Sequence, residues 1–584
     1  MATTSTATAT TTSLEVSGPA APAPSVDAAH TTTTTTTTTN RQPGDQDNEP
    51  SYSPLAVALI FLVPALGGFL FGYDISGTSF VLQALTSSSN NDDGVVTSDG
   101  QHTVAWSQII AASPVWQGLL VAASSLGAFV SSAYIMRRTI GRRTELQLGA
   151  VLYICGATLE SARMGGHHGI ASQVLGLTVF LTGRIIYGFG IGITMHAAPT
   201  YLGEMVPSSI RGALVSGKEA CIVLGIVMGY TIGAAVPSSH WPSIYTSTLP
   251  FSVVMLLVAM FLIPESGRYL LLQDPLRYEP QAMLSMEYVF PHGTTAQQQV
   301  REIQASIQQE QERRGITVGA NIEGAPSALA TSPTWKQWMQ PQYRLPLTAG
   351  LGLVILQQVT GQPSVLSYAT QILEQAGLMG SAAIPIALFK LVATLYAASV
   401  VEQFGRVKLL MSGCSLMLVA LLTLAFYFGE GFQIEVGSID VTKYLVLLAL
   451  FMYIGGYQVG FGPVTWLMTS EVFPLAIRGQ AVALAVQLNF LLNALVQFGV
   501  PVLQHAIGLA WTFGIFAILD LLSLFFVRAY VPETKGLTLE QIERIFQPAV
   551  VDDSAENERV LLTEPLLRRP PVRSYSTNSS DENV

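Results

Sequence analysis

The chain has 584 residues, of which 49% are hydrophobic and only 11% are charged. Soluble domains carry about 25% charged residues, so this depletion over such a length excludes a soluble protein and indicates a multi-spanning membrane protein. The formal net charge of −10 says little about partners, because acidic tails contribute to it. Three cysteines, Cys155, Cys221 and Cys414, all lie in apolar stretches. This pattern is typical of buried free thiols and not of a disulfide framework or a metal site.

Residues 1–50 are rich in Ala, Thr and Pro and include nine consecutive threonines at 31–39. Their apolar content is too low to bury a core, so we expect a disordered tail. We expect no secretory signal here, because the segment has no basic start and no apolar core. A plastid transit peptide is the alternative, since the tail is rich in hydroxyl groups, although it has no Arg or Lys before Arg41.

Apolar runs of about 20 residues, the length that spans a bilayer, follow this tail. We expect six spans at 55–83, 113–136, 145–163, 171–194, 213–236 and 245–263, and six more at 343–374, 381–401, 408–428, 443–469, 480–502 and 508–531. The sequence therefore predicts an all-α membrane protein with twelve transmembrane helices in two six-helix bundles. The predicted parts are a tail at 1–50, a bundle at 51–263, a cytoplasmic linker with short helices at 264–342, a bundle at 343–535 and a tail at 536–584. In the linker, Gln297 to Arg314 has strong helix formers and few apolar residues, which predicts a surface helix.

One short stretch occurs twice in the chain. Glu204, Pro207, Ile210, Arg211 and Gly212 recur 267 positions later as Glu471, Pro474, Ile477, Arg478 and Gly479. Gly141-Arg142 and Pro264-Glu265 recur at similar distances as Gly405-Arg406 and Pro532-Glu533. Repeats in register predict two parallel halves with a substrate site between them near the membrane midplane.

The distribution of Lys and Arg predicts the orientation of the chain. The loop at about 84–112 has neither residue, whereas the loops after the second and eighth spans and the central linker carry several. We therefore expect both termini and the linker on the cytoplasmic side.

Asp74 is a carboxylate inside the first predicted span, in a glycine-rich stretch. Carboxylates within a membrane are costly and commonly mark proton relays, although a structural ion pair is the alternative. Arg184, in the fourth span, is its expected partner. A guanidinium that approaches and leaves would let Asp74 release and bind a proton. The glycines after Arg184 indicate close helix packing and not a dinucleotide site.

Amides and hydroxyls are dense in the seventh predicted span, which carries Gln357, Gln358, Gln362 and Tyr368. Each such group needs a partner in an apolar helix. Amides both donate and accept, which suits sugar hydroxyls, and interhelical hydrogen bonding is the alternative. Further candidates for contact with the substrate are Trp466, Asn489, Asn493 and Glu219. Trp466 could stack on a sugar ring or anchor a helix at the interface. Glu219 could form a local pair with Lys218 instead.

The repeated Glu and Arg residues predict a gate at the cytoplasmic helix ends. Arg142, Glu204 and Arg211 in the first half, and Arg406, Glu471 and Arg478 in the second, can form ion pairs that act as a two-state switch. Anchoring of the topology alone is the alternative.

Taken together, these motifs resemble the sugar porter family of the major facilitator superfamily over about residues 55–545. They are Gly141-Arg-Arg143, Arg184 with its glycines, Pro199 to Gly212, Pro264 to Arg268, Gln357 to Gly361, Gly462 to Gly479 and Pro532 to Gly536. Within the family, the chain looks most like the plant vacuolar glucose transporter and xylose–proton symporter-like group.

The resemblance implies a protonated aspartate at Asp74 with Arg184 as its partner, and sugar contacts at Gln357, Gln358, Trp466 and Asn493. It also implies that Glu402 is the acidic residue of the cytoplasmic gate in the second half. The chain departs from the family at Glu219, Ile226, Pro363 and Ser367, where amides or a tyrosine are usual, and at Arg138, where an acidic residue is usual. These departures leave the preferred sugar open.

The sequence therefore predicts a carrier of a monosaccharide, a hexose such as glucose or else xylose, coupled to protons through Asp74. A uniporter and a sugar sensor that does not transport are the alternatives. We expect no enzyme activity, cofactor, metal or nucleic-acid partner, and a monomer in the lipid bilayer. Leu566-Leu567 in the tail resembles the dileucine sorting signals that direct plant carriers to the vacuolar membrane, so we favour that membrane. The plasma membrane and the plastid envelope are the alternatives.

Overall fold

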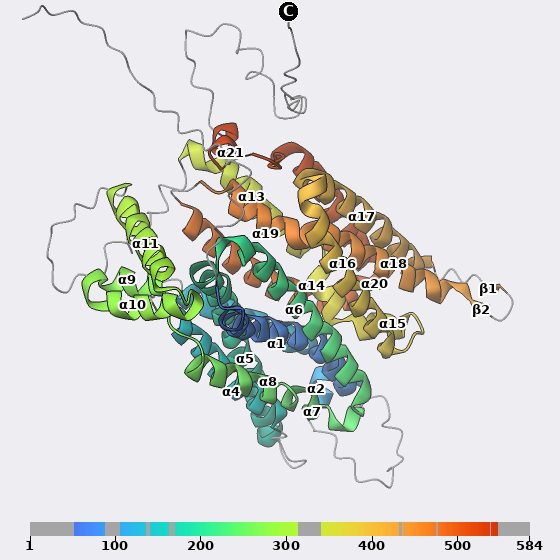
Figure 1. Ribbon diagram of the computed structural model, residues 1–584. Coiled ribbons are helices and arrows are strands. Elements are labelled where there is room, and N and C mark those ends of the chain that lie inside the picture. Colours follow the sequence, from blue (N-terminus) through green and yellow to red (C-terminus); the bar gives the residue numbers. More distant parts are fainter. Residues whose placement is uncertain are drawn as a thin grey trace, which may run out of the picture. The chain divides into compact units, whose positions relative to one another are not determined.

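The computed structural model describes residues 52–87, 106–135, 140–162, 170–313, 340–430, 435–436, 439–474, 477–537 and 539–546. These residues are almost entirely helical (Figure 1). One antiparallel pair of two-residue strands, β1 (Glu435–Val436) and β2 (Ile439–Asp440), is the exception. The predicted N-terminal tail and nearly all of the C-terminal tail, including Leu566-Leu567, lie outside the described residues.

The first half of the chain forms long helices connected by short ones. They are α1 (Pro54–Ser87), α2 (Ser107–Ala112), α3 (Pro114–Ile135), α4 (Arg142–Ser161), α5 (Ile170–Met205), α6 (Ser208–Ala235), the 3₁₀ turn η2 (Ser238–His240), α7 (Pro242–Thr246) and α8 (Leu249–Phe261). The segment that follows contains α9 (Gly267–Gln273), α10 (Pro275–Val289) and α11 (Gly293–Arg313). Helix α11 covers the stretch for which a surface helix was predicted.

The second half repeats the pattern with different interruptions. Its elements are α13 (Pro341–Val359), α14 (Gln362–Ser367), α15 (Ala369–Gln375), η4 (Gly380–Ala382), α16 (Ala383–Phe404), α17 (Arg406–Glu430), α18 (Val441–Val459), α19 (Phe461–Val472), α20 (Arg478–Tyr530) and α21 (Leu539–Phe546). The seventh predicted span is thus broken into α13, α14 and α15. The break is at Gly361, whose φ is 94°, and Pro363 lies in the first turn of α14. The tenth predicted span is broken in the same way, into α18 and α19.

Nine helices in the described part of the chain are long and apolar enough to cross a membrane by length and composition. One of them, α20, joins the predicted spans 480–502 and 508–531 across a kink at Gly508. The predicted spans 145–163 and 343–374 correspond to α4 and to α13–α15, which that criterion does not include.

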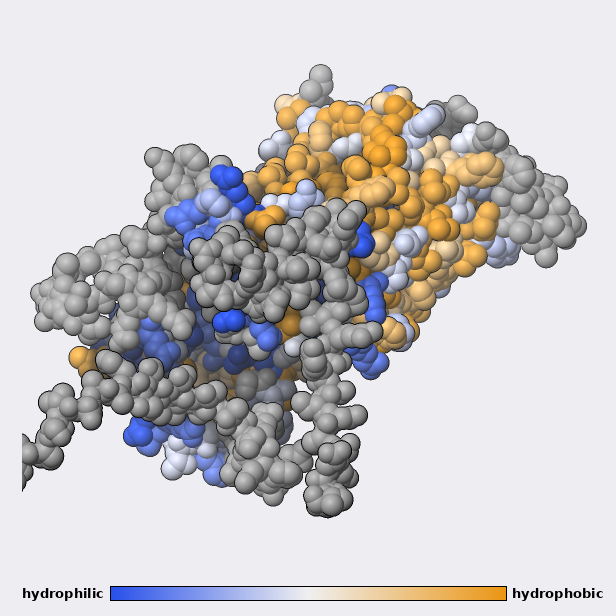
Figure 2. Space-filling view, turned by 90° about the horizontal axis from the view of Figure 1, so that it is seen from above, coloured by the Kyte–Doolittle hydropathy of each residue, from blue (hydrophilic) through white to orange (hydrophobic). Residues whose placement is uncertain are grey.

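Apolar side chains face outward on these helices. Large exposed ones include Val392, Leu395, Val419, Leu422, Phe426, Leu448, Ile518, Leu522 and Phe525. In Figure 2 such residues cover much of the visible surface, while hydrophilic residues gather toward one end. A surface of this kind is stable against lipid and not against water.

Glycines set the closest helix contacts in the first half. A Cβ at Gly72 of α1 would lie 1.8 Å from the Ile222 carbonyl oxygen of α6. A Cβ at Gly188 of α5 would lie 2.0 Å from the Ser124 carbonyl oxygen of α3. The glycines that follow Arg184 therefore pack helices together, as predicted. This contact brings α3 and α5 close enough for their polar side chains to meet.

The two halves also touch each other. Helix α3 packs along α20, α6 packs along α16, and α1 contacts α14 and α15. Hydrogen bonds cross the same boundary between Ser79 and Thr370 and from Tyr230 to the Leu366 carbonyl. Residues from both halves can therefore contribute to one site.

Candidate transport site

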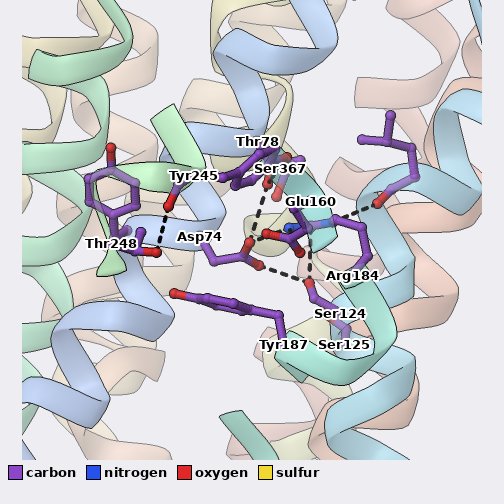
Figure 3. Close-up of polar contacts among 12 residues, drawn as sticks. Asp74, Thr78, Ser124, Ser125, Glu160, Arg184, Tyr187, Tyr245, Thr248 and Ser367 are labelled. Atoms are coloured by element: carbon purple, nitrogen blue, oxygen red, sulfur yellow. Dashed lines mark hydrogen bonds and ion pairs between the residues drawn. The ribbon is translucent and has the colours of Figure 1, made fainter. Parts of the chain in front are cut away.

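Asp74 and Arg184 form a direct ion pair in the interior of the first half (Figure 3). Asp74 is 4% exposed and Arg184 is 1% exposed. Ser124 of α3 donates to Asp74 Oδ2 at 2.9 Å, and Thr78 donates to Oδ1 at 3.4 Å. Arg184 Nη2 donates to the Ser124 hydroxyl at 3.1 Å, and Nε donates to the Leu120 carbonyl at 3.2 Å. Helices α1, α3 and α5 thus all contribute bonds to this buried ion pair. The sequence predicted the two charged partners, on α1 and α5, but not the contribution of α3.

A chain of amides lies between α13 and α20. Gln358 Nε2 donates to Asn489 Oδ1 at 2.5 Å, and Asn493 Nδ2 donates to Gln358 Oε1 at 3.2 Å. One turn later, Gln497 Nε2 donates to the Ser367 hydroxyl at 3.1 Å, and the Tyr368 hydroxyl donates to the Gln497 carbonyl at 2.8 Å. The structure therefore brings together four of the predicted contact residues, namely Gln358, Tyr368, Asn489 and Asn493.

Two consecutive serines of α3 connect the ion pair to this amide chain. Ser124 bonds to Asp74 and Arg184, as described above. Ser125, the next residue, donates to Asn493 Oδ1 at 2.8 Å and to Gln497 Oε1 at 3.1 Å. A cavity of about 10 Å³, the order of one water molecule, lies between the two groups. It is lined by Asp74, Thr78, Ser124, Ser125 and Arg184 from the first half and by Ser367 and Gln497 from the second.

Several buried polar atoms near these amides have no hydrogen-bond partner among the described residues. They are Gln357 Oε1, Ser364 Oγ and Thr465 Oγ1. Gln357 is 2% exposed, and its Nε2 donates to the Phe461 carbonyl at 3.1 Å. An amide fixed through its donor and left with a free acceptor is ready to receive a hydroxyl.

The other predicted contact residues are placed less centrally. Gln362 opens α14 and is half-buried, and Trp466 is half-buried in α19. Glu219 is 45% exposed and pairs with Lys218 at 2.9 Å, which is the local pair given above as its alternative.

At the predicted cytoplasmic ends, each half has an Arg–Glu pair. Arg142 Nη2 lies 3.5 Å from Glu204 Oε1, and Arg406 Nη2 lies 2.8 Å from Glu471 Oε1. Both pairs join helices of one half. Arg211 and Arg478 each donate to a carbonyl five residues earlier, Val206 at 3.2 Å and Phe473 at 3.0 Å. The side chain of Glu402 and residue Arg138 lie outside what the structure describes.

Sequence reasoning missed Ser124 and Ser125, described above, and three further polar residues. Glu160 lies 3.6 Å from Arg184 Nη1. It falls near the end of a predicted span, where a carboxylate is easily taken for a boundary residue. Gln497 continues the spacing of four that relates Asn489 to Asn493, so the helical period contained its signal. Lys390, a cation inside a predicted span, donates to Gln458 Oε1 at 2.8 Å.

A family model described as "Sugar (and other) transporter" matches residues 60–546. The chain belongs to this family of transporters. The resemblance to sugar porters of the major facilitator superfamily is thereby confirmed, and so is the expectation of a multi-pass transporter and not an enzyme.

Relatives at the sequence level include two symporter-like proteins of Arabidopsis thaliana. "D-xylose-proton symporter-like 2" is 37% identical over 510 residues, covering 84% of this chain and 91% of the relative. "D-xylose-proton symporter-like 3, chloroplastic" is 37% identical over 519 residues, covering 85% and 84%. The "Glucose transporter GlcP" of Staphylococcus epidermidis is 28% identical over 492 residues, covering 83% and 96%.

The fold is similar to that of solved transporters. The inward open conformation of the xylose transporter XylE from E. coli matches with a TM-score of 0.64 and 25% identity, over 84% of this chain and 100% of that one. XylE bound to 6-bromo-6-deoxy-D-glucose matches with a TM-score of 0.60. The predicted all-α fold of the major facilitator superfamily is therefore confirmed.

Proposed function

We propose that this transporter carries a monosaccharide by alternating access and couples its movement to protons through Asp74. The observation that carries the proposal is the pair Ser124–Ser125. One serine bonds to the Asp74–Arg184 pair and its neighbour bonds to the amides of the other half. A change in the charge of Asp74 therefore reaches the amide chain through one short segment of α3.

The sugar would bind where buried acceptors are free. Sugar hydroxyls can donate to Gln357 Oε1, Ser364 Oγ and Thr465 Oγ1, which lack partners among the described residues. Binding would also exchange the bonds within the Gln358–Asn489–Asn493 cluster for bonds to the ligand. Trp466 would offer its ring face, and Gln362 and Glu219 are the peripheral candidates. The names of the relatives support glucose and xylose as the first sugars to test.

Proton coupling would follow from the burial of the ion pair. Ionised Asp74 holds Arg184, whereas protonated Asp74 has no net charge with which to hold it. Separation of the pair frees Ser124, which bonds to both partners. The names of the Arabidopsis relatives support a symport mechanism.

Alternating access would use the contacts between the halves. Ser79 lies in the last third of α1, and Thr370 lies near the end of the predicted span 343–374, on the side that the predicted orientation places away from the cytoplasm. These contacts support a state closed on that side. The two Arg–Glu pairs would then regulate the opening of the cytoplasmic side. They are Arg142–Glu204 and Arg406–Glu471, and the further candidates for this gate are Arg211, Glu402 and Arg478. We place a monomer in the vacuolar membrane, and the chloroplastic relative supports the plastid envelope as the alternative.

Uptake into proteoliposomes tests this function. Radiolabelled glucose and xylose would be supplied with and without an imposed pH gradient, to the natural protein and to Asp74→Asn. The proposal expects accumulation driven by the gradient, its loss in Asp74→Asn, and retention of exchange at equal sugar concentrations. Uptake that ignores the gradient and the substitution would make the protein a uniporter. Sugar binding without any flux would make it a sensor.

A further inference from the structure

Glu160 of α4 is a second carboxylate beside Arg184 (Figure 3). Its side chain is 0% exposed. Neither Oε1 nor Oε2 has a hydrogen-bond partner among the described residues, and Oε1 lies 3.6 Å from Arg184 Nη1. Asp74, in contrast, accepts bonds from Ser124, Thr78 and Arg184. Asp74 therefore accepts several hydrogen bonds that would stabilise its charge, whereas Glu160 accepts none from the described residues.

Among the described residues, the helices around Glu160 supply a single cation. Helix α5 contributes Arg184 and Tyr187, α1 contributes Asp74, and α7 contributes Tyr245 (Figure 3). Helix α8 also packs on α4 and has no titratable side chain along its length. On α4 itself, Tyr153 lies two turns away, and its ring contacts that of Tyr187. Tyrosines are neutral at physiological pH, so the part of these surroundings that the structure describes holds two carboxyls and one guanidinium.

One guanidinium neutralises one carboxylate. A second ionised carboxylate, 3.6 Å from a guanidinium already paired with Asp74 and without a hydrogen-bond partner among the described residues, would recover only part of its desolvation cost. The protonated acid avoids this cost, and Asp74 is the better supported of the two as the anion. We propose that Glu160 is a resident proton-binding site, a carboxylic acid that stays neutral through the transport cycle.

A neutral Glu160 would serve the Asp74–Arg184 switch, and this role rests on the proposed function. When Asp74 is protonated, Arg184 loses its anionic partner but stays buried. The carbonyl oxygen of the neutral Glu160 is an acceptor one small movement away. Glu160 is thus a positioning residue that holds Arg184 in place while Asp74 carries the transported proton, and its own O–H bond is never broken.

Infrared difference spectroscopy tests the protonation state without any transport assay. Spectra of the purified protein at neutral pH would be compared with those of Glu160→Gln and Asp74→Asn. The proposal expects a carbonyl stretch of a buried carboxylic acid that is lost in Glu160→Gln and kept in Asp74→Asn. Asp520, another buried carboxyl, contributes equally to all three spectra and cancels. Absence of the band from the natural protein overturns the proposal. Loss of the band in Asp74→Asn would show that the proton on Glu160 depends on Asp74, and this result also overturns the proposal.

Transport separates this inference from the proposed function. Glu160→Gln keeps a neutral acceptor and should retain uptake driven by the gradient, whereas Glu160→Leu should slow it about tenfold, the size of a lost hydrogen bond to a charged group. Loss of coupling in Glu160→Gln overturns the resident role. Failure of the natural protein to transport sugar would overturn the proposed function and leave the spectroscopic result valid.

Discussion

At the scale of residues, the Asp74–Arg184 pair is embedded in hydroxyl groups. The Ser124 hydroxyl both donates to Asp74 and accepts from Arg184. A proton on Oδ2, the oxygen to which Ser124 donates, would turn that acceptor into a donor, and Ser124 would then change partners. The peptide bond between Ser124 and Ser125 then links this change to Asn493 and Gln497. Proton binding and sugar binding would in this way act on one another.

Ser125→Ala removes the one hydroxyl hydrogen that Asn493 and Gln497 share across the halves, and it leaves Ser124 in place. A hydrogen bond of this kind contributes about 0.5–1.5 kcal/mol, so we expect sugar affinity to change by about twofold to tenfold. Equilibrium binding of labelled sugar to the purified protein measures this. The matched control is Ser132→Ala, on the same helix, because Ser132 bonds only to its own helix at the Phe129 carbonyl. Equal effects of the two substitutions would show that Ser125 has no special link to the amides.

Asp74 and Arg184 were predictable from the sequence, whereas Glu160 and the hydroxyls that bond to the pair were not. Asp74 and Arg184 stand out because each is a charge in an apolar run. Ser124 and Ser125 do not, since serines are common in membrane helices and usually bond within their own helix. The ion pair could thus be predicted from the sequence, whereas its connection to the amides required the packing of α3 against α20.

At the scale of elements, the repeated Pro-Glu motifs cap two helices. Glu265 accepts from the Arg143 backbone N–H at 2.9 Å, in the first turn of α4. Glu533 accepts from the Arg406 and Val407 backbone N–H groups at 2.8 and 3.1 Å, in the first turn of α17. A carboxylate at a helix N-terminus is stabilising. The repeated motifs, read in the sequence as signs of duplication, are therefore structural caps at equivalent places.

Gly405→Ala should destabilise the protein more than Gly508→Ala. Both glycines have nearly the same backbone, with φ of 87° and 83° and ψ of 164° and 166°, a region that costs other residues about 1–3 kcal/mol. A Cβ at Gly405 would also lie 2.7 Å from Glu533 Oε2, whereas nothing lies within 4 Å at Gly508. Thermal unfolding in detergent measures the difference. Equal melting temperatures for the two variants would contradict a contribution from the cap.

Predicted spans and observed helices agree where hydrophobicity is continuous. The limits of the observed helices differ from those of the predicted spans where the backbone breaks or kinks within a continuous apolar stretch. Gly361 and Pro363 break the seventh span, which their identities indicated. The predicted gap near 503–507 is helical in the structure, and only Gly508 interrupts α20.

At the scale of the whole transporter, a carrier must open its two sides in turn. The contacts from Ser79 to Thr370 and from Gln83 to Glu374 join α1 to α15 across the halves. These contacts must break when that side opens. The Arg–Glu pairs at the other end lie within each half, so they can stay formed during such a movement.

A cross-link between Ser79→Cys and Thr370→Cys should stop transport. The hydroxyl oxygens of the natural residues are 2.9 Å apart, so the two thiols would lie within reach of each other. We expect oxidation to abolish sugar uptake and reduction to restore it. Each single cysteine variant, treated in the same way, controls for reaction at the native cysteines. Full uptake by the oxidised double variant, with the cross-link confirmed by mass, would contradict a movement at this contact.

The most direct measurement of the central claim is sugar-driven proton flux. Proteoliposomes containing a pH-sensitive dye would receive a glucose or xylose gradient with no imposed pH gradient. We predict that inward sugar flow acidifies the lumen of vesicles holding the natural protein, and that Asp74→Asn abolishes the acidification but not sugar exchange. Sugar flow at full rate without any change in pH would contradict proton coupling through the Asp74–Arg184 pair.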